Sequence, residues 1–281
     1  MTNASSNVTV IIPCYNDGAY IMEALESIYN QTVLPEKIII VDDGSNTSTK
    51  NVLATINNPL VHLVYQENQG VSVARNYAIS LAQTDYIVNL DADDYYEATF
   101  IEKAIQILDT DTTIGVVSSH CWTFSEKKKI SIVRPLGGGV TDFLFINNGR
   151  ASAMFRKECW EKVGGFDENM KAGYEDWEFW LAITKNNWRM HIIPEILSHY
   201  RIKNTSRDRT AIVHHDYELR MYIFNKHKEM YQTHFEFYAS ALLRQNSILR
   251  NSLRNAKESR EFQIGLLVLA PFRFLKKIVS R

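Results

Sequence analysis

Two apolar segments that each run into a cluster of aspartates constrain the fold of this chain most strongly. Ile38–Val41 continues into Asp42-Asp43-Gly44-Ser45, and Tyr86–Leu90 continues into Asp91-Ala92-Asp93-Asp94. Short apolar runs of this length are typical of buried strands. Carboxylates crowded at the carboxyl ends of neighbouring strands repel one another, and in open α/β sheets this edge is where ligands bind. The two clusters therefore predict an α/β sheet with a ligand site along one edge.

The rest of the first 110 residues supports that prediction. Further apolar runs at Val8–Ile12 and Val61–Tyr65 are predicted strands, and apolar positions at helical spacing predict helices between the runs, such as the one starting at Gly70. Repeated βα units of this length imply a parallel sheet with right-handed crossovers. After Gly115 the pattern changes to a hairpin, short strands and helices, and from Asp216 onward it predicts helices alone.

Composition excludes some classes of protein and leaves others open. The chain has 281 residues, of which 45% are hydrophobic and 22% charged, as in ordinary globular proteins. A net charge of −1 argues against nucleic acid as a partner. Three widely spaced cysteines form no disulfide framework, and no apolar segment is long enough for a signal peptide or a membrane span. We therefore expect a reduced, cytoplasmic protein.

The charge is unevenly distributed, because residues 1–200 are acidic and residues 201–281 are basic. A basic region suggests an anionic partner, and a membrane surface is the first candidate. In the segment from Ile264 to Arg281, Phe274, Leu275 and Ile278 share one helical face, which fits an interfacial helix. A last helix packed on the body with its basic face in solvent explains the pattern equally well. The sequence thus allows peripheral contact with the inner face of a membrane.

Residues at the ends of the first two strands form a candidate binding site for a base. Pro13 fixes the chain as it leaves the sheet, and Tyr15 then lies at the edge, where it could stack on a base or fill a loop core. Asp42 can accept an N–H group from a pyrimidine such as uracil, or it can cap the turn that follows. We assign the turn to Asp43 and the ligand to Asp42, and beside Asp42 we favour stacking for Tyr15.

Asp91 and Asp93 are candidate metal ligands. Two apart on extended chain, they project to the same side, whereas Asp94 points away. A Mg²⁺ or Mn²⁺ ion would relieve their repulsion, and it would need further oxygens of the kind that a diphosphate supplies. Asn68 and Arg75 are expected near the same edge, with Arg75 either a ligand contact or a structural ion pair to the local acids.

Glu175 and Asp176 open a predicted helix that extends to Asn186. Adjacent helical residues point about 100° apart, so only one of the pair can face a reacting atom. If Trp177 faces the core, Asp176 is the better candidate to take a proton from an attacking hydroxyl. An acidic helix start that serves only the helix dipole explains this segment at least as well.

Taken in order, these segments resemble glycosyltransferase family 2, whose members are inverting nucleotide-sugar transferases of the GT-A fold. The resemblance covers residues 8 to about 205 and rests on the ordered set Val10-Ile11-Ile12-Pro13-Cys14-Tyr15-Asn16, Val41-Asp42-Asp43-Gly44-Ser45, Glu67-Asn68-Gln69-Gly70, Ala74-Arg75-Asn76, Leu90-Asp91-Ala92-Asp93-Asp94, Val163-Gly164-Gly165-Phe166-Asp167 and Glu175-Asp176. It implies a UDP-sugar donor, with Asp42 on the base, Asp91 near the ribose and metal, Asp93 as metal ligand and Asp176 as catalytic base.

The resemblance also implies a domain plan and a class of product. Residues 1–210 would form the GT-A catalytic domain, with a nucleotide-binding half at 1–110 and an acceptor half at 111–210, and residues 211–281 a helical C-terminal region. We expect a metal-dependent hexosyl- or N-acetylhexosaminyltransferase that acts on a carbohydrate or lipid-linked acceptor in surface polysaccharide or glycoconjugate synthesis. The sequence names neither the sugar nor the acceptor.

One position departs from the pattern of the family. Many relatives carry a histidine in a Tyr-Arg-x-His segment near the metal and diphosphate, but here Tyr200-Arg201-Ile202-Lys203 places a lysine there. Lys203 could contact the diphosphate as a point charge. His199 just upstream is an alternative metal ligand, although a histidine at the end of a strand is more often a satisfied structural residue.

Two rival functions remain open from the sequence. A nucleotidyltransferase would also bind a nucleotide and a metal over an α/β sheet, but it usually has a basic, glycine-rich loop after its first strand. The segment from Pro13 to Gly18 contains no Lys or Arg. A non-catalytic module that binds nucleotide or carbohydrate is the other alternative, and the presence of both acidic clusters together with Glu175-Asp176 argues against it.

Overall fold

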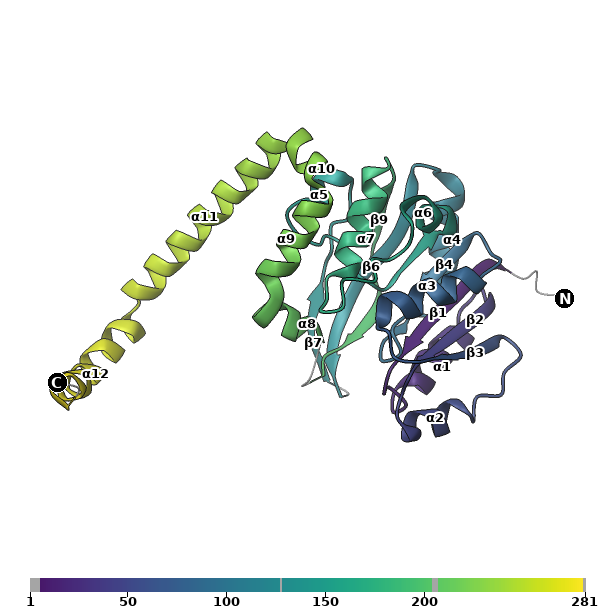
Figure 1. The fold of residues 1–281 in the computed structure, drawn as a ribbon, viewed down its shortest axis with the longest axis horizontal. Coiled ribbons are helices and arrows are strands. Elements are labelled where there is room, and N and C mark those ends of the chain that lie inside the picture. The colour runs from purple at the N-terminus through teal and green to yellow at the C-terminus, as the bar shows by residue number, and fades with distance from the viewer. Residues whose placement is uncertain (1–5, 127, 204–206, 280–281) are drawn as a thin grey trace. The chain divides into compact units, whose positions relative to one another are not determined.

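The first half of the sheet is parallel and carries the nucleotide-site segments. The computed structural model describes residues 6–126, 128–203 and 207–279. Four strands lie in the order β3-β2-β1-β4 and are all parallel (Figure 1). The elements of this half are β1 (Ser6–Cys14), α1 (Ile21–Tyr29), β2 (Pro35–Asp43), α2 (Thr47–Leu53), β3 (Val61–Gln66), α3 (Val71–Leu81) and β4 (Tyr86–Asn89). The alternation of strand and helix predicted for the first 110 residues is confirmed.

The second half of the sheet is mixed. It continues from β4 in the order β8-β6-β9-β5, with β7 paired to β6 at the side; β8 is antiparallel to both its neighbours, and β6 and β9 are parallel. The elements are β5 (Tyr95–Tyr96), α4 (Phe100–Thr110), β6 (Ile114–Ser125), β7 (Lys128–Val133), α5 (Val140–Phe143), β8 (Ala153–Arg156), α6 (Lys157–Val163), α7 (Glu175–Lys185) and β9 (Arg189–Arg201). The predicted α/β class with a largely parallel central sheet is confirmed.

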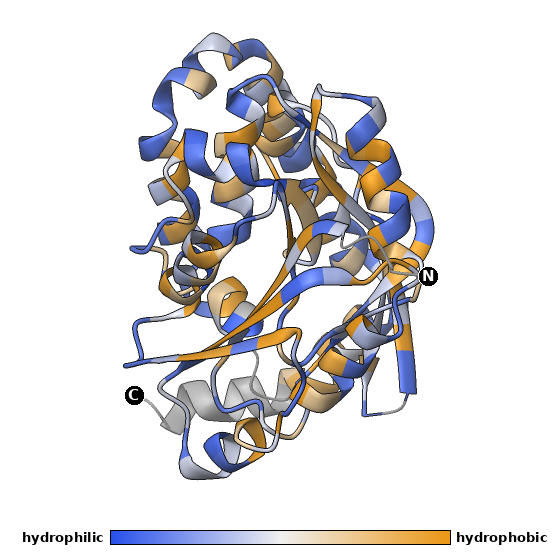
Figure 2. Cartoon of the chain, turned by 90° about the vertical axis from the view of Figure 1, so that its right-hand side faces the viewer, coloured by the Kyte–Doolittle hydropathy of each residue, from blue (hydrophilic) through white to orange (hydrophobic). Residues whose placement is uncertain are grey.

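The packing of the core explains why the sequences of the central strands are continuous apolar runs. Both faces of β1 are covered, as is usual for parallel sheets. Val8, Val10 and Ile12 point to one face and pack in a cluster with residues of α1 and α4. The other face of β1 and β2 is covered by α3. Figure 2 shows hydrophobic stretches along the strands, and helices that alternate between hydrophobic and hydrophilic residues.

The helix starts near the sheet edge need unusual backbone angles. α3 begins after Gly70, whose φ of 98° lies in the region that glycine adopts without strain. α7 begins after Tyr174, a non-glycine residue in the left-handed conformation with φ of 62°. The prediction that α3 starts at the Gly70 turn is confirmed.

The bounds of the long strand β9 were not predicted from the sequence. The position of this strand brings its C-terminal end next to β5 and the second aspartate cluster. Its end pairs with β5, so that Tyr95 lies opposite His199. The backbone N–H of Arg201 donates to Oδ1 of Asp94 at 2.8 Å. The segment after β9 is thereby fixed beside the second aspartate cluster. This cluster is a turn and not extended chain, because the Asp94 N–H donates to the Asp91 carbonyl.

The chain divides into two compact units, Met1–Gln232 and Thr233–Arg281. The first unit also contains α8 (Arg207–Thr210), a π-helical turn at Ala211–His215, α9 (Asp216–Lys226) and most of α10 (Lys228–Thr233). The second consists of α11 (Phe235–Glu258) and α12 (Arg260–Val279), so the predicted helical C-terminal part is confirmed. Within the described residues, no helix has both the length and the apolar character that crossing a bilayer requires. The expected apolar face at Phe274, Leu275 and Ile278 lies outside the described side chains.

Candidate active site

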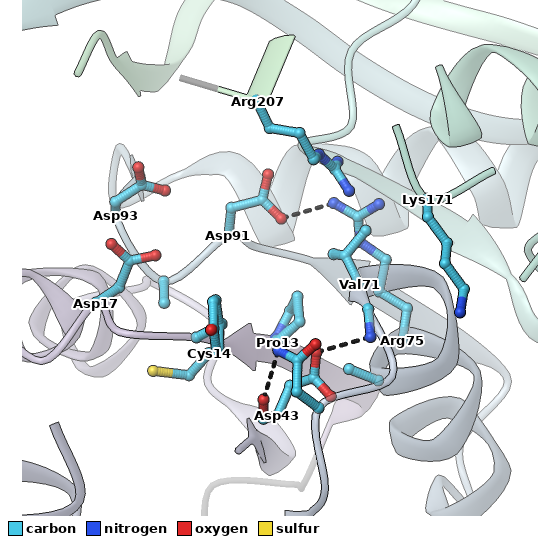
Figure 3. Close-up of a pocket in the computed structure, with 15 residues that line it drawn as sticks. Pro13, Cys14, Asp17, Asp43, Val71, Arg75, Asp91, Asp93, Lys171 and Arg207 are labelled. Atoms are coloured by element: carbon cyan, nitrogen blue, oxygen red, sulfur yellow. Dashed lines mark hydrogen bonds and ion pairs between the residues drawn. The ribbon is translucent and has the colours of Figure 1, made fainter. Parts of the chain in front are cut away.

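A pocket of about 400 Å³ lies at the carboxyl ends of β1, β2 and β4 (Figure 3). Six of the predicted site residues line it, namely Pro13, Tyr15, Asn68, Arg75, Asp91 and Asp93. These residues come from four separate segments of the first 93 residues. The topology brings them together because the carboxyl ends of parallel strands meet at one edge of the sheet.

Tyr15 and Asp43, the last residue of β2, both line the pocket. The Tyr15 ring is 52% exposed, so it is available for stacking. Asp43, and not Asp42, lines the pocket. Asp42 is fully buried, and its Oδ1 accepts a hydrogen bond from the Ser45 N–H at 2.9 Å, so it caps the turn that we expected Asp43 to cap. The second oxygen of Asp42 is buried with no hydrogen-bond partner within the part of the chain that the structure describes.

Asp43 organises the loop that leads into α3. Its Oδ1 accepts hydrogen bonds from the Gln66 side chain and the Gln69 N–H, and its Oδ2 accepts one from the Gly70 N–H at 2.9 Å. The Asn68 side chain in turn donates to the Asp43 carbonyl at 2.9 Å. The carboxylate therefore fixes the loop and also presents a polar edge to the pocket.

Arg75 forms the buried centre of the site. Its side chain is only 1% exposed, and it donates to Asp91 at 2.7 Å and to Glu175 at 2.8 Å. Arg207 also donates to the same Glu175 oxygen. Of the two roles left open for Arg75, the structural ion pair is therefore realised, although the side chain also lines the pocket. A buried pair of this kind is costly to break, because removing one partner leaves an uncompensated charge.

The charges in this buried group oppose the effect of burial. Burial alone would raise the pKa of Asp91, but the Arg75 guanidinium lowers it below the ordinary value. Burial likewise favours the neutral form of Glu175, and Arg207 and Arg75 together lower its pKa. Both carboxylates are therefore ionised at neutral pH and hold Arg75 in place.

Asp93 has a different environment at the other side of the pocket. Lys203, which follows β9, places its ammonium group 2.7 Å from an oxygen of Asp93 and 2.7 Å from one of Asp17. Burial, assisted by the charges on Asp91 and Asp17 and opposed by Lys203, raises the pKa of Asp93 to about 6. The neighbouring Asp94 is buried and does not line the pocket, as expected, and burial raises its pKa well above the ordinary value.

The donor set fits a divalent cation that is completed by a ligand. Among the described residues, no three His, Cys, Asp or Glu side chains converge as a metal-ligand group. Asp91 and Asp93 supply two carboxylates at the pocket, where Arg75 holds the first and Lys203 the second. Mg²⁺ is commonly bound through one or two carboxylates plus phosphate oxygens, which matches this set.

Glu175 and Asp176 differ in what their carboxylates contact. Glu175 is buried beneath Arg75 and Arg207, whereas Asp176 is partly buried and accepts a hydrogen bond from the Asn147 side chain at 2.9 Å. Neither residue is part of the pocket lining, but both cations bound to Glu175 are. The start of α7 is thus placed one contact away from the pocket.

His199 is placed away from the pocket lining. Its Nε2 lies 2.7 Å from a Glu97 oxygen, and its ring stacks on Tyr95 with centroids 4.2 Å apart. Burial lowers its pKa, so the ring is neutral at neutral pH. Metal ligation by His199 stays a prediction, and these contacts give the ring a structural role.

Four charged residues that line the pocket were not assigned to the ligand site from the sequence, namely Asp17, Asp43, Lys171 and Arg207. Asp43 belongs to a cluster that was recognised, and only its role was assigned differently. Asp17 stands two positions after Tyr15, but no spacing rule marks it. Lys171 reaches the site from the turn before α7 and Arg207 from the start of α8, both far along the chain, and no local pattern could have revealed them.

Comparisons with known proteins agree with this architecture. The profile described as glycosyl transferase family 2 matches residues 9–169. The chain is 26% identical to the hyaluronan synthase of Pasteurella multocida, over 85% of the chain and 28% of that protein. It is 25% identical to the chondroitin synthase of the same species, over 78% of the chain and 26% of that protein. The chain therefore spans about a quarter of the length of these relatives.

A solved structure shares the fold. S. aureus TarS 1-349 in complex with UDP-GlcNAc is similar with a TM-score of 0.69 and 19% sequence identity, and the match covers 91% of this chain and 77% of that one. At this identity the likeness concerns the fold, which is the GT-A architecture expected from the sequence.

Proposed function

The chain belongs to glycosyltransferase family 2, and from that premise we propose that it transfers a sugar from a UDP-sugar to a hydroxyl of a carbohydrate or lipid-linked acceptor. The observation that carries the proposal is the pocket. It brings together the exposed Tyr15, the carboxylates of Asp91 and Asp93, and the cations Lys171 and Arg207. The UDP-GlcNAc complex of TarS, which has the same fold, supports a UDP-sugar as donor.

The donor would lie along the sheet edge. Tyr15 stacks on the base, and an acid at the end of β2 accepts the uracil N–H. The sequence pointed to Asp42 for that contact; Asp43 is better placed, because it lines the pocket. Lys171 and Arg207, which also line the pocket, supply positive charge for the diphosphate, as phosphate sites generally require.

Asp91 and Asp93 would hold the divalent cation. A Mn²⁺ or Mg²⁺ ion bound there supplies a Lewis acid that stabilises the departing nucleoside diphosphate. Arg75 orients the Asp91 carboxylate by its hydrogen bond to Oδ1. Glu175 holds Arg75 from the other side, so it acts as a positioning residue and not as the base.

Asp176 is the proposed general base of an inverting displacement. The acceptor oxygen forms a bond to the anomeric carbon while the bond to the diphosphate breaks, and the hydroxyl proton passes to the Asp176 carboxylate. The hydrogen bond from Asn147 orients this carboxylate. Glu175 is less suited to the role, because two guanidiniums already bind its Oε1.

The product class and the location are also part of the proposal. The relatives include a hyaluronan synthase and a chondroitin synthase, which supports transfer of a hexose or N-acetylhexosamine in polysaccharide synthesis. The basic region after residue 200 supports peripheral contact with the inner face of a membrane. Unchanged liposome association after removal of residues 264–281 would contradict that contact.

Asp176→Asn separates binding from chemistry. We expect the variant to bind UDP-sugar as the unaltered protein does, and its turnover to fall by about 10²–10⁴-fold, the range of general acid–base catalysis. A screen of UDP-sugars with Mn²⁺, read by thermal shift and by released UDP, identifies the donor first. Glu161→Gln, an exposed change on α6, serves as the matched control. Full turnover in Asp176→Asn would remove this residue as the base.

A further inference from the structure

Lys203 is a cation beside the pocket that two carboxylates share and that solvent still reaches. Its ammonium group lies 2.7 Å from Asp17 and 2.7 Å from Asp93, and its side chain is 30% exposed. Arg201, two residues earlier, anchors the same end of β9 through the Asp93 carbonyl, to which its Nε donates at 2.9 Å. The residues at and after the C-terminal end of β9 thus bring a positive charge to Asp93.

We propose that Lys203 competes with a divalent cation for the Asp93 carboxylate, so that binding of the ion displaces the ammonium group from Asp93. This inference rests on the proposed function only in taking Asp93 as a cation ligand. It assigns to Lys203 the role of an internal counter-ion, which keeps the pocket neutralised before metal and donor arrive.

Charge and mobility both support the competition. A carboxylate oxygen at 2.7 Å from an ammonium group shares its charge with that group, and an incoming ion must outweigh this interaction. Lysine is a flexible point charge, and Asp17 provides a second carboxylate on which the displaced ammonium group can remain. Arg75 cannot yield in this way, since it is 1% exposed and held by two acids.

The test measures binding of Mn²⁺ alone to the full chain, without nucleotide, from the electron paramagnetic resonance signal of free Mn²⁺ at fixed ionic strength. We expect Lys203→Gln to lower the Kd for Mn²⁺ by about tenfold or more, the effect of removing one close opposing charge. Lys203→Arg keeps the positive charge on a less yielding guanidinium, so we expect its Kd for Mn²⁺ to be equal to or higher than that of the unaltered protein.

A matched control comes from α9. Lys226 also bridges two acids, Asp167 at 2.6 Å and Glu178 at 2.8 Å, and is 38% exposed. Lys226→Gln should leave the Kd for Mn²⁺ unchanged. The proposal is overturned if Lys203→Gln binds Mn²⁺ no tighter than the unaltered protein or shows no binding, or if Lys226→Gln tightens binding equally.

Failure of this proposal is distinguishable from failure of the proposed function. A parallel titration with UDP-sugar reports the donor site independently of the competition. Absent donor binding with a tightened Mn²⁺ Kd would contradict the proposed function and leave the role of Lys203 standing. Intact donor transfer with an unchanged Mn²⁺ Kd would do the reverse.

Discussion

Asp91 and Asp93 are two residues apart, and yet the protein treats them in opposite ways. Asp91 is bound by Arg75, a buried guanidinium that also holds Glu175, and its pKa is lowered. Asp93 is bound by the half-buried Lys203, which it shares with Asp17, and its pKa is raised to about 6. Burial acts to raise the pKa of both carboxylates: Arg75 outweighs it at Asp91, whereas Lys203 does not outweigh it at Asp93, where the charges of Asp91 and Asp17 add to it.

Arg75 and Lys203 differ in burial and mobility, as the chemistry of their side chains predicts. A guanidinium offers several donors in a rigid plane and suits a buried bridge between two acids, whereas an ammonium group is compact and flexible. The Arg75 side is therefore a fixed part of the scaffold, and the Lys203 side is adjustable. Each prediction below tests one side of this difference.

Arg75→Met should give the largest effect. The change leaves Asp91 and Glu175 without their shared partner, and breaking a buried ion pair costs about 3–5 kcal/mol of unfolding free energy. Urea denaturation measures this directly. Lys103→Met removes an exposed pair to Glu195 and should cost less than about 1 kcal/mol. Equal losses in the two variants would show that Arg75 is not a scaffold residue.

Glu175→Gln should make the free energy of unfolding depend less steeply on pH in the acid range. The two guanidiniums lower the pKa of Glu175 in the folded protein, so the unfolded chain takes up this proton first as the pH falls. The stability that Glu175 contributes is present above its unfolded pKa and is lost as the pH falls through the folded value. Without this carboxyl, the slope below about pH 4.5 should decrease by up to about 1.4 kcal/mol per pH unit. Urea midpoints over this range provide the measurement, and parallel slopes would contradict the pairing.

Lys203→Gln should have the smallest effect on stability. A partly exposed ion pair contributes about 0–1 kcal/mol, and loss of the lysine leaves Asp17 and Asp93 accessible to water and salt. Thermal unfolding at neutral pH without added metal tests this expectation. A loss as large as that of Arg75→Met would place Lys203 in the scaffold and remove the contrast between the two sides.

The local elements followed directly from the sequence. Apolar runs predicted β1, β2, β3 and β4, and apolar residues spaced along one helical face predicted α1 and α3. In each of these elements, the spacing of the apolar residues matches the side chains that the element buries. The ends of β2 and β4 also gave the edge on which Asp43, Asp91 and Asp93 gather. β9 was harder to delimit, since its 13 residues mix buried and exposed positions without regular alternation.

By itself, the sequence determined the α/β plan, the edge that carries the site and six of the residues at the pocket, because strand ends and their polar residues are local in the chain. Only the tertiary structure decided which acid meets which cation. The partners of Arg75 lie 16 and 100 positions away, and Lys203 reaches Asp17 across 186 positions. Such pairs depend on strand order and side-chain burial, which no local pattern records.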